Sequence, residues 1–458
     1  MASANNNKIE SYIVPGTRVH LIGIGGVSMR PLGLVLRGMG LKVTGSDMNS
    51  SVMTDDLIDQ GIPVFIGHRA ENIRGAQCII RTAAVHNDNP EIAAARAKGI
   101  PVFERAQAWG EIMKAYQNAI CLSGTHGKTT TTSMVTHIFM EAQWDPTVMI
   151  GGTLPLLNAG HRVGKGDTII MESCEYCNSF LNFFPTVAVV LNIEADHLDF
   201  FKDLADVQAS FRKFCRLVPE NGCIIANGDD ENTRTALAGM RYTSFGLMVG
   251  NDVHGENYST DWHEFDVICD GKHYSHVKLS VVGKHNAMNA LAAAACAWQL
   301  GIDGETVARG LATFTGAGRR LEYKGEYHGA AIYDDYAHHP GELHALISAL
   351  KSMHYQRIVL AFQPHTYTRT NALFDDFVRE LKQVDHVVLA EIYAAREVNT
   401  IGISSHDLAQ QIRGSVCFDT LPEVAQYLQS IARKGDIIVT VGAGDIFKAG
   451  EMLLEQKA

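Results

Sequence analysis

The sequence of 458 residues predicts an α/β protein with three domains, each built on a mainly parallel sheet covered by helices. Apolar strands alternate with helical stretches along almost the whole chain, which is typical of βαβ units. Several of these strands end in polar or acidic residues, as in sheets that bind ligands at their carboxyl ends. The length also corresponds to about three domains at the usual ~150 residues each. We place the domains at residues 1–116, 117–316 and 317–458.

The composition argues against several classes of protein. A net charge of −11 disfavours a broad nucleic-acid surface, while a local basic site for a small anion remains compatible with it. No apolar run approaches the ~20 residues that span a membrane, and the first residues lack a signal-peptide core. The 9 cysteines are odd in number and lack framework spacing, which fits a reducing cytoplasm. We expect a soluble cytoplasmic protein without nucleic-acid or membrane partners.

The first block contains a glycine-rich turn after its first strand. The turn, GIGGVS, nearly matches Gly-x-Gly-x-x-Gly, with Ser28 in place of the third glycine. Asp47 ends the next strand, close to the ~20-residue spacing at which an acidic residue binds a ribose. This pattern predicts a Rossmann-like N-terminal domain and, taken alone, suggests an NAD-dependent oxidoreductase. The expected strands are residues 17–26, 41–47, 63–67, 77–85 and 100–106, with a helix at 29–40.

The second block opens with a phosphate-binding motif, SGTHGKTTTT, at residues 123–132. A strand precedes the motif and a helical stretch follows it, the setting in which backbone N–H groups hold phosphate. Lys128 would neutralise the β- and γ-phosphates of ATP, and the hydroxyl of Thr129 or Thr130 would bind Mg²⁺. The approach is shorter than in the common P-loop, whose first glycine would fall at Leu122.

A glycine-rich turn with Ser or Thr helix caps is the alternative interpretation of this motif. Gly-Lys-Thr between a strand and a helix favours a central P-loop ATPase-type α/β domain. Since nothing else in the sequence resembles a hydride-transfer site, we assign the first glycine turn to a nucleotide-linked substrate and the second loop to ATP. The ATP-binding candidates in the loop are Gly124, Thr125, His126, Gly127, Lys128, Thr129 and Thr130.

Acidic and imidazole groups follow the next strands of the central block. Glu175 and His197 are our candidates to hold Mg²⁺ against the phosphates. Asp196 and Asp199 are equally well explained as caps of the following helix. Cys174 and Cys177 have Cys-x-x-Cys spacing, but a single pair is weak evidence for zinc, and we assign them no chemistry. The expected strands are residues 118–124, 168–176, 186–197 and 222–230, with short antiparallel strands over 242–279.

The segment GKHNAMNALAA and the third block offer further polar groups. Asn286 and Asn289 can pair with an adenine edge, although Asn286 can also cap the long helix that starts there. Arg320 can stabilise transferring phosphoryl charge, unless Arg319 and Arg320 are only a solvated linker. Asp335 can hold a ribose hydroxyl. The expected strands of the third block are residues 330–337, 357–365, 386–394 and 436–445, with helices at 371–383 and 421–434.

The chain resembles the Mur ligase family of peptidoglycan synthesis over nearly its whole length. The DDYAHHP and QPHTYTRT motifs point to the branch that acts first, on UDP-N-acetylmuramate. The resemblance implies three α/β domains, the last Rossmann-like, and a dependence on ATP and Mg²⁺. The motifs that carry it, in the order of the family, are HLIGIGGVSM, SGTHGKTTTT, NIEADHLD, GKHNAMNALAA, RRLE, DDYAHHPGE, FQPHTYTRT, AEIYAAREVNT and GAGDI.

The reaction that the resemblance implies is the formation of an amide. ATP would phosphorylate the lactyl carboxylate of UDP-N-acetylmuramate, and the amine of L-alanine would displace phosphate from the acyl phosphate. A related recycling ligase, which adds a peptide to the same sugar nucleotide, is the alternative. A regulatory protein that binds nucleotide without catalysis is a second one. We expect a monomer or a homodimer.

The resemblance also assigns residues to each part of the site. UDP would meet Gly25, Gly26, Ser28, Asp47 and His68. The metal would meet Thr129, Glu175 and His197, the adenine Asn286 and Asn289, the γ-phosphate Arg320, and the ribose Asp335. The muramyl and alanine end would meet His338, His365 and Arg369, and the catalytic set would be Lys128, Glu175, His197, Arg320 and His338.

Two positions depart from patterns in the family. Later-acting ligases carry a carbamylated lysine about where this chain has Phe211, so we expect its metals to be held without that group. Thr366 stands where many relatives have arginine, which leaves Arg369 as the main candidate for a carboxylate contact.

Overall fold

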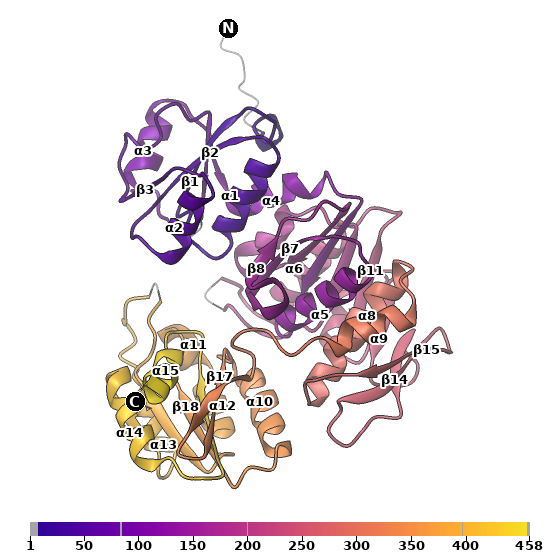
Figure 1. Ribbon diagram of the computed structural model, residues 1–458, viewed down its shortest axis with the longest axis vertical. Coiled ribbons are helices and arrows are strands. Elements are labelled where there is room, and N and C mark those ends of the chain that lie inside the picture. Colours follow the sequence, from indigo (N-terminus) through magenta and orange to yellow (C-terminus); the bar gives the residue numbers. More distant parts are fainter. Residues whose placement is uncertain (1–7, 83–84, 199, 396, 456–458) are drawn as a thin grey trace.

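The computed structural model describes residues 8–82, 85–198, 200–395 and 397–455, and its strands form three sheets (Figure 1). The predicted fold class is confirmed, since each sheet is mainly parallel and covered by helices. The predicted bounds at 116 and 316 fall between the last strand of one sheet and the first of the next. The bounds themselves remain a prediction.

The first sheet has five parallel strands in the order β3-β2-β1-β4-β5. β1 lies at its centre, so the glycine turn that follows this strand opens at the middle of the carboxyl edge. The elements are η1 (Ile9–Ser11), β1 (Arg18–Ile22), α1 (Met29–Gly38), β2 (Lys42–Asp47), α2 (Val52–Asp59), β3 (Val64–Ile66), β4 (Cys78–Arg81), α3 (Pro90–Ala97), β5 (Val102–Glu104) and α4 (Arg105–Met113).

The central sheet has ten strands in the order β15-β14-β13-β12-β11-β10-β6-β9-β7-β8. The elements are β6 (Asn118–Ser123), α5 (Lys128–Glu141), β7 (Thr147–Leu154), η2 (Pro155–Leu157), β8 (Ala159–Arg162), β9 (Thr168–Glu172), η3 (Tyr176–Asn182), β10 (Val187–Val190), α6 (Leu204–Cys215), β11 (Cys223–Asn227), α7 (Glu231–Ala236), β12 (Thr243–Gly246), β13 (Val253–Glu256), β14 (Glu264–Cys269), β15 (Lys272–Lys278), α8 (Lys284–Gln299) and α9 (Gly304–Ala312).

The prediction of antiparallel strands over 242–279 is wrong for half of that segment. β12 and β13 pair in parallel and extend the central sheet beyond β11, and only β14 and β15 add antiparallel strands. The short connection from β12 to β13 carries no crossover helix, which is why the sequence pattern suggested hairpins. The antiparallel β7–β8 pair at the opposite edge was not predicted.

The third sheet has six strands in the order β16-β17-β21-β18-β19-β20, and only the β16–β17 pair is antiparallel. The elements are β16 (Glu322–Tyr327), β17 (Ala330–Asp335), α10 (Pro340–Ser352), β18 (Arg357–Phe362), α11 (Tyr367–Ala372), α12 (Phe374–Leu381), β19 (His386–Ala390), α13 (Ser405–Gln411), β20 (Val416–Phe418), α14 (Leu421–Ile431), β21 (Asp436–Val441) and α15 (Phe447–Glu455).

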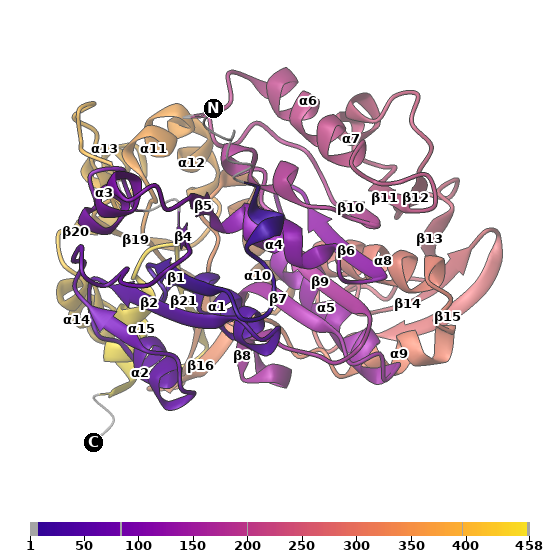
Figure 2. The same ribbon diagram turned by 90° about the horizontal axis from the view of Figure 1, so that it is seen from above.

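The central sheet separates two apolar cores, because successive residues of a strand face opposite sides. In β6, Ile120 and Leu122 join the core beneath α5 and α8, whereas Ala119 and Cys121 face the core under α6. Figure 2 shows α6 and α7 on one side of the sheet and α5, α8 and α9 on the other. Both faces of the strands are buried, which explains their continuous apolar runs.

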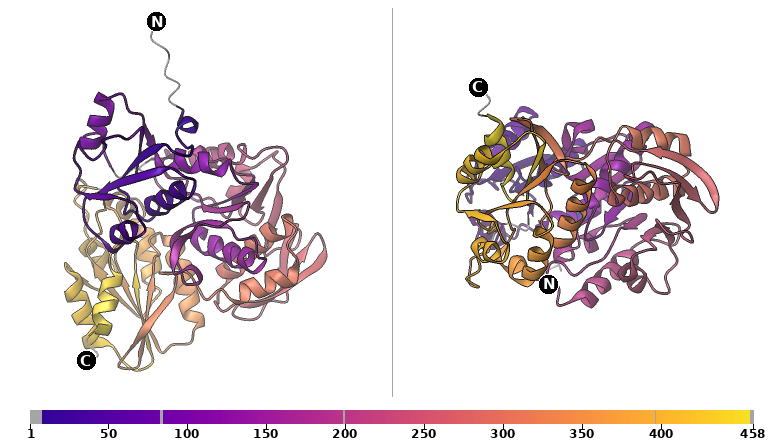
Figure 3. Two further views of the ribbon diagram at one scale, coloured as in Figure 1. Left: turned by 45° about the horizontal axis from the view of Figure 1, so that its top comes forward. Right: turned by 90° about the horizontal axis from the view of Figure 1, so that it is seen from below.

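Helix α4 joins the first domain to the central one. Its residues Trp109 and Ile112 are buried in an apolar cluster that also contains residues of β1 and of α6. A Cβ added at Gly110 would lie 1.9 Å from the carbonyl O of Asn182, so the helix and η3 are in backbone contact. In Figures 1 and 3 the first and third domains lie on the same side of the central domain.

Among the described residues, none of the helices combines the length and the apolar content that crossing a bilayer requires.

We predict that Gly110→Ala lowers the free energy of unfolding by about 1–3 kcal/mol, because the new methyl group overlaps the Asn182 carbonyl. Thermal or urea unfolding of the full chain measures this. Gly38→Ala is the matched control, since Gly38 ends α1 and its added Cβ meets nothing within 4 Å. The control is expected to be neutral or slightly stabilising. Equal stabilities of the two variants would contradict the close contact.

Candidate active site

The phosphate loop follows the end of β6 and leads directly into α5. Gly127 is the N-cap of this helix with a φ of +81°, a conformation that favours glycine. A Cβ at Gly127 would lie 2.6 Å from Oδ1 of Asn289, so the loop rests on α8. Asn289 also accepts a hydrogen bond of 3.2 Å from Thr131. The loop is shorter than a common P-loop. Because Gly127 leads directly into the N-terminus of α5, its backbone N–H groups can still bind a phosphate.

The ammonium of Lys128 lies among oxygen atoms at the start of α5. Nζ donates to the carbonyl O of Gly124 and, at 3.1 Å, to that of Thr125. It also lies 3.2 Å from Oε2 of Glu175, a residue that is 2% exposed. Burial lowers the pKa of Lys128, but the Glu175 carboxylate raises it more, so the net shift of the pKa is upward. Lys128 therefore remains a cation at neutral pH, as the neutralisation of a triphosphate requires.

Oxygen donors gather on the other side of the loop. Thr129 donates from Oγ1 to Oε2 of Glu172 at 2.9 Å, and the same carboxylate oxygen accepts from the backbone N–H of Gly151 at 2.8 Å. Nε2 of His197 lies 3.9 Å from Oε1 of Glu175. The structure thus brings together Glu175 and His197, as predicted. Glu172, which the prediction left out of the metal set, is the direct partner of Thr129.

His126 forms the contact between the phosphate loop and the third domain. Its backbone N–H donates to Oδ1 of Asn192 at 2.7 Å. Its ring lies 3.2 Å from Glu194 of the same domain and 3.5 Å from Glu342 of α10. Burial lowers the pKa of His126, but the two carboxylates raise it to about 9. The imidazolium therefore links the two domains as an ion pair.

The side chains of His126, Glu194 and His339 place ligand atoms within 4.8 Å of one another, close enough to hold a metal ion. Since His126 is protonated at neutral pH, an ion-pair cluster is the better description of this group. Sequence reasoning missed Glu194 and Glu342. The DDYAHHPGE motif carried the signal for Glu342, because a glutamate three residues after His339 completes a capping box at α10.

The two adjacent arginines of the linker have different surroundings. Arg319 is fixed within the third domain, since it donates to Asp334 at 2.8 Å and to the carbonyl O atoms of Gly442 and Gly444. The guanidinium of Arg320 instead lies 3.8 Å from Glu342 and over the ring of Tyr336. A solvated linker is therefore the wrong interpretation of both residues. Arg320 faces the junction with the central domain.

Asp335 and His338 are held at the carboxyl end of β17. Both carboxylate oxygens of Asp335 accept backbone N–H groups, from Leu321 at 2.7 Å and from Ala337 at 2.8 Å. Burial raises the pKa of Asp335 to about 6. Burial also lowers the pKa of His338 to about 4, and its Nδ1 lies 3.0 Å from the carbonyl O of Tyr336. That contact assigns the proton to Nδ1 and leaves Nε2 as an acceptor.

Arg369 crosses from the third domain to the central one. Its guanidinium lies 3.2 Å from Oδ1 of Asp196, and both side chains are largely buried. Burial raises the pKa of Asp196, but the guanidinium lowers it more, and the net shift is downward. Asp196 is therefore not a helix cap, and Asp203 caps α6 instead. Asp199 lies outside the described residues.

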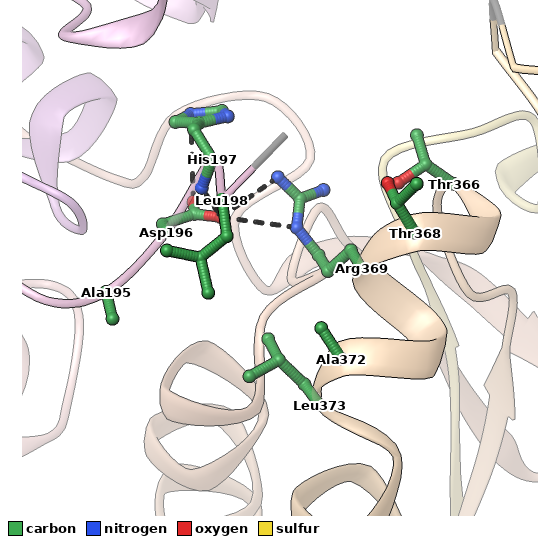
Figure 4. Close-up of a pocket in the computed structure, with 9 residues that line it drawn as sticks. All are labelled: Ala195, Asp196, His197, Leu198, Thr366, Thr368, Arg369, Ala372 and Leu373. Carbon is green, nitrogen blue, oxygen red and sulfur yellow. Dashed lines mark hydrogen bonds and ion pairs between the residues drawn. The ribbon is translucent and has the colours of Figure 1, made fainter. Parts of the chain in front are cut away.

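A pocket of about 160 Å³ lies beside this ion pair, as Figure 4 shows. Its walls come from the segment after β10 on one side and from α11 on the other. The predicted residue His365 lies next to it, with Nδ1 3.4 Å from Nη1 of Arg369 and its ring stacked on Tyr393. The lining residues are Ala195, Asp196, His197, Leu198, Thr366, Thr368, Arg369, Ala372 and Leu373.

The first glycine turn forms a separate part of the site. The backbone N–H of Gly25 donates to Oδ2 of Asp47 at 2.9 Å, so Asp47 orders the turn. Ser28 precedes α1 and contacts the guanidinium of Arg105, a residue that was not predicted. His68 follows β3, and its Nδ1 is 3.2 Å from Oγ of Ser46 and 3.4 Å from Oε2 of the buried Glu91.

Asn286 does not cap helix α8, the alternative role considered for it from the sequence. Gly283 is the N-cap of this helix, and Asn286 lies within the first turn, where Nδ2 donates to the carbonyl O of Val282 at 2.8 Å. Asn289 supports the phosphate loop through its amide oxygen. The adenine assignments of Asn286 and Asn289 remain predictions, as do the UDP contacts of Gly26 and the ATP contact of Thr130.

We predict that the free energy of unfolding falls between pH 6.5 and 9 by on the order of 1–2 kcal/mol, because His126 loses its proton there. The pKa of His126 is raised in the folded state, so its contribution is complete below pH 6.5 and is lost as the pH rises. Denaturant unfolding at several pH values measures it. His126→Gln is expected to flatten this decline, and an unchanged decline would contradict the ion pair.

Three family models match the chain. Residues 18–117 match the catalytic domain of the Mur ligase family, residues 122–297 the Mur ligase middle domain, and residues 319–444 the Mur ligase glutamate ligase domain. The UDP-N-acetylmuramate–L-alanine ligase of Caldicellulosiruptor saccharolyticus is 43% identical over 445 residues, which is 95% of this chain and 98% of that protein. The enzyme of the same name from Acetivibrio thermocellus is 44% identical and covers 96% of each chain.

A solved structure agrees with these matches. The crystal structure of UDP-N-acetylmuramate–alanine ligase MurC from Thermotoga maritima superimposes with a TM-score of 0.81 and 28% sequence identity, over 96% of this chain and 98% of that chain. The fold, the order of the three domain models and the full-length relatives all agree. The chain belongs to the Mur ligase family.

Proposed function

We propose that the protein joins L-alanine to the lactyl carboxylate of UDP-N-acetylmuramate in peptidoglycan synthesis, with the cleavage of ATP to ADP and phosphate. Relatives that carry this activity in their names are 43–44% identical over at least 95% of the chain. One observation in the structure supports it best. His197 lies 3.9 Å from Glu175 beside the phosphate loop and also lines the pocket next to Arg369, so the two halves of a ligase site meet at this residue.

The pocket beside Arg369 has the dimensions of a small amino acid. Its volume of about 160 Å³ is below the roughly 300–1,000 Å³ that is typical of sites for drug-sized ligands, which favours a ligand as small as L-alanine. Arg369 supplies a cation for the carboxylate of the amino acid, and Ala195, Leu198 and Ala372 supply an apolar wall for its methyl group. Thr366, at the position where many relatives have arginine, lines the same pocket. Because Thr366 carries no charge, Arg369 is the cationic side chain among the lining residues of this pocket.

The proposed ligase reaction has two steps, the phosphorylation of the carboxylate and the formation of the amide. An oxygen of the lactyl carboxylate attacks the γ-phosphorus of ATP, ADP leaves, and an acyl phosphate forms. The amine of L-alanine then attacks the acyl carbon, the bond from that carbon to the phosphate oxygen breaks, and phosphate leaves with the amine proton as hydrogen phosphate while the amide forms. Two polyanions must meet in the first step, so cations have to offset their repulsion. Lys128 and Arg320 are the side chains that we assign to this role.

Magnesium fits the donor set at the phosphate loop. The Thr129 hydroxyl and the carboxylates of Glu172 and Glu175 are the oxygen donors that this ion prefers, and His197 adds a nitrogen at the edge of the group. We assign the ion to Thr129, Glu175 and His197, with Glu172 orienting Thr129. Bound there, Mg²⁺ would neutralise charge on the phosphates.

The remaining residues position the reactants and exclude water. The neutral His338 lies outside the pocket lining, with its ring 5.9 Å from that of His365, which contacts Arg369. The contacts of His126 with Glu342 and of Arg369 with Asp196 bring the third domain over the phosphate loop. Such a cover protects an acyl phosphate from hydrolysis. The nine cysteines are all free thiols, which agrees with the cytoplasmic location that we propose.

Release of phosphate from ATP tests the proposed function. The full chain is incubated with ATP, Mg²⁺ and UDP-N-acetylmuramate, together with L-alanine, glycine, L-serine or a tripeptide. We expect phosphate release that depends on both the sugar nucleotide and L-alanine. Preference for the tripeptide would assign the protein to the recycling reaction. The absence of amine-dependent release with every acceptor would reject a ligase.

We predict that Lys128→Ala reduces kcat by at least about 10²–10³-fold, because the phosphates lose their cation. Binding of UDP-N-acetylmuramate, measured by calorimetry, is expected to stay unchanged, since the glycine turn lies in another domain. Lys213→Ala, which removes an exposed lysine from α6, is the matched control. A kcat in Lys128→Ala equal to that of the control would contradict the role of the loop.

A further inference from the structure

A second cavity lies in the first domain, at the edge of the sheet opposite the glycine turn. Its volume is about 390 Å³, within the range of small-molecule sites. Arg18 begins β1 and Lys42 begins β2, and both residues line it. The glycine turn follows the other end of β1, about 13 Å away along the strand. The cavity is therefore separate from the site of the proposed ligase reaction.

The charged residues that line this cavity are all cations. Arg18, Arg37, Lys42 and Arg74 contribute to its walls, and no acidic residue does so among the described lining residues. Within the part of the chain that the structure describes, the side chains of these four residues form no ion pair within 4.0 Å and no hydrogen bond. Many other arginines of the protein, such as Arg30 and Arg357, pair with carboxylates.

Four exposed cations are concentrated at this edge of the first sheet. Arg18 and Lys42 are partners in the parallel register of β1 and β2, so two cations lie side by side at the start of neighbouring strands. Arg37 joins them from the last turn of α1, and its Nη1 would lie 3.7 Å from a Cβ at Gly61. Arg74 comes from the turn before β4. The dipole of α1 explains a cation at Arg37 alone, but it does not explain why three further cations surround the same cavity.

The chemistry of the walls defines the class of ligand. Four cations in one cavity of a chain with a net charge of −11 form a local site for an anion of high charge. The uncharged part of the wall, which includes Val19, Val43 and Pro63, contains no aromatic ring on which a nucleobase could stack. Recognition would therefore depend on phosphate groups, which arginine binds in bidentate geometry.

We propose that this cavity binds a small anion with two or more phosphate groups, at a site distinct from both nucleotide sites of the ligase. The site lies on the same five-stranded sheet that carries the glycine turn, so an occupant contacts the domain that binds the sugar nucleotide. The ligands of this site are the side chains of Arg18, Arg37, Lys42 and Arg74.

Calorimetry with inorganic tripolyphosphate tests the proposal. The full chain is used with Lys128→Ala as background, so that the phosphate loop contributes little binding. We expect one binding event that Arg37→Gln with Arg74→Gln weakens at least ten-fold. The matched control is Arg241→Gln with Arg413→Gln, two exposed arginines of the other domains, which removes the same charge and is expected to change the Kd less than two-fold.

Three results would overturn the proposal. The first is that the background protein does not bind tripolyphosphate at millimolar concentration, and the second is that the pocket and control variants lose equal affinity. The third is that phosphatidylglycerol vesicles compete with tripolyphosphate for the protein and bind more tightly through Arg37 and Arg74, which would assign the cations to a membrane surface. With Lys128 intact, the Arg37→Gln and Arg74→Gln variant is expected to keep its ligase activity, so failure of this site is distinguishable from failure of the proposed function.

Discussion

The ion pair between Arg369 and Asp196 is the contact on which the arrangement of the site depends. It connects α11 of the third domain to the segment after β10 of the central domain, and the pocket beside it has one wall from each. Without this contact neither domain alone encloses a space for an amino acid. The pair is largely buried, so removing one partner would leave an uncompensated charge, which costs far more than an exposed pair contributes.

The junction between the central and third domains contains both carboxylates and cations. In the proposed site, the carboxylates of Glu172 and Glu175 would face a divalent cation, while Lys128 and Arg320 would face phosphates. The structure pairs cations with carboxylates, Lys128 with Glu175 and Arg320 with Glu342. A triphosphate with its metal ion would replace these internal partners without leaving any charge alone. Preorganised charges of this kind need little rearrangement during the reaction.

Much of this organisation could be predicted from the sequence, because local patterns carry it. Periodicity and the glycine turns identified three α/β domains, and Gly-Lys-Thr between a strand and a helix located the loop. The partners across domains could not be predicted. Glu194 and Glu342 are 148 residues apart in sequence, and the ring of His126 lies within 3.5 Å of both carboxylates. The cations around the first sheet were missed for the same reason, since Arg18, Lys42 and Arg74 are isolated in the sequence and converge only when β1, β2 and β4 align.

The close contact between α4 and η3 affects how this protein can be recombined with its relatives. The apolar cluster of the first domain continues through Trp109 into the side of the central sheet that faces α6, so the two domains share one cluster of buried apolar residues. An exchange of the first domain alone would place a foreign helix against Asn182, at a position where only a glycine leaves room. A chimera therefore has to take α4 and η3 from the same parent, and the unit of exchange is larger than the first five-stranded sheet with its own helices.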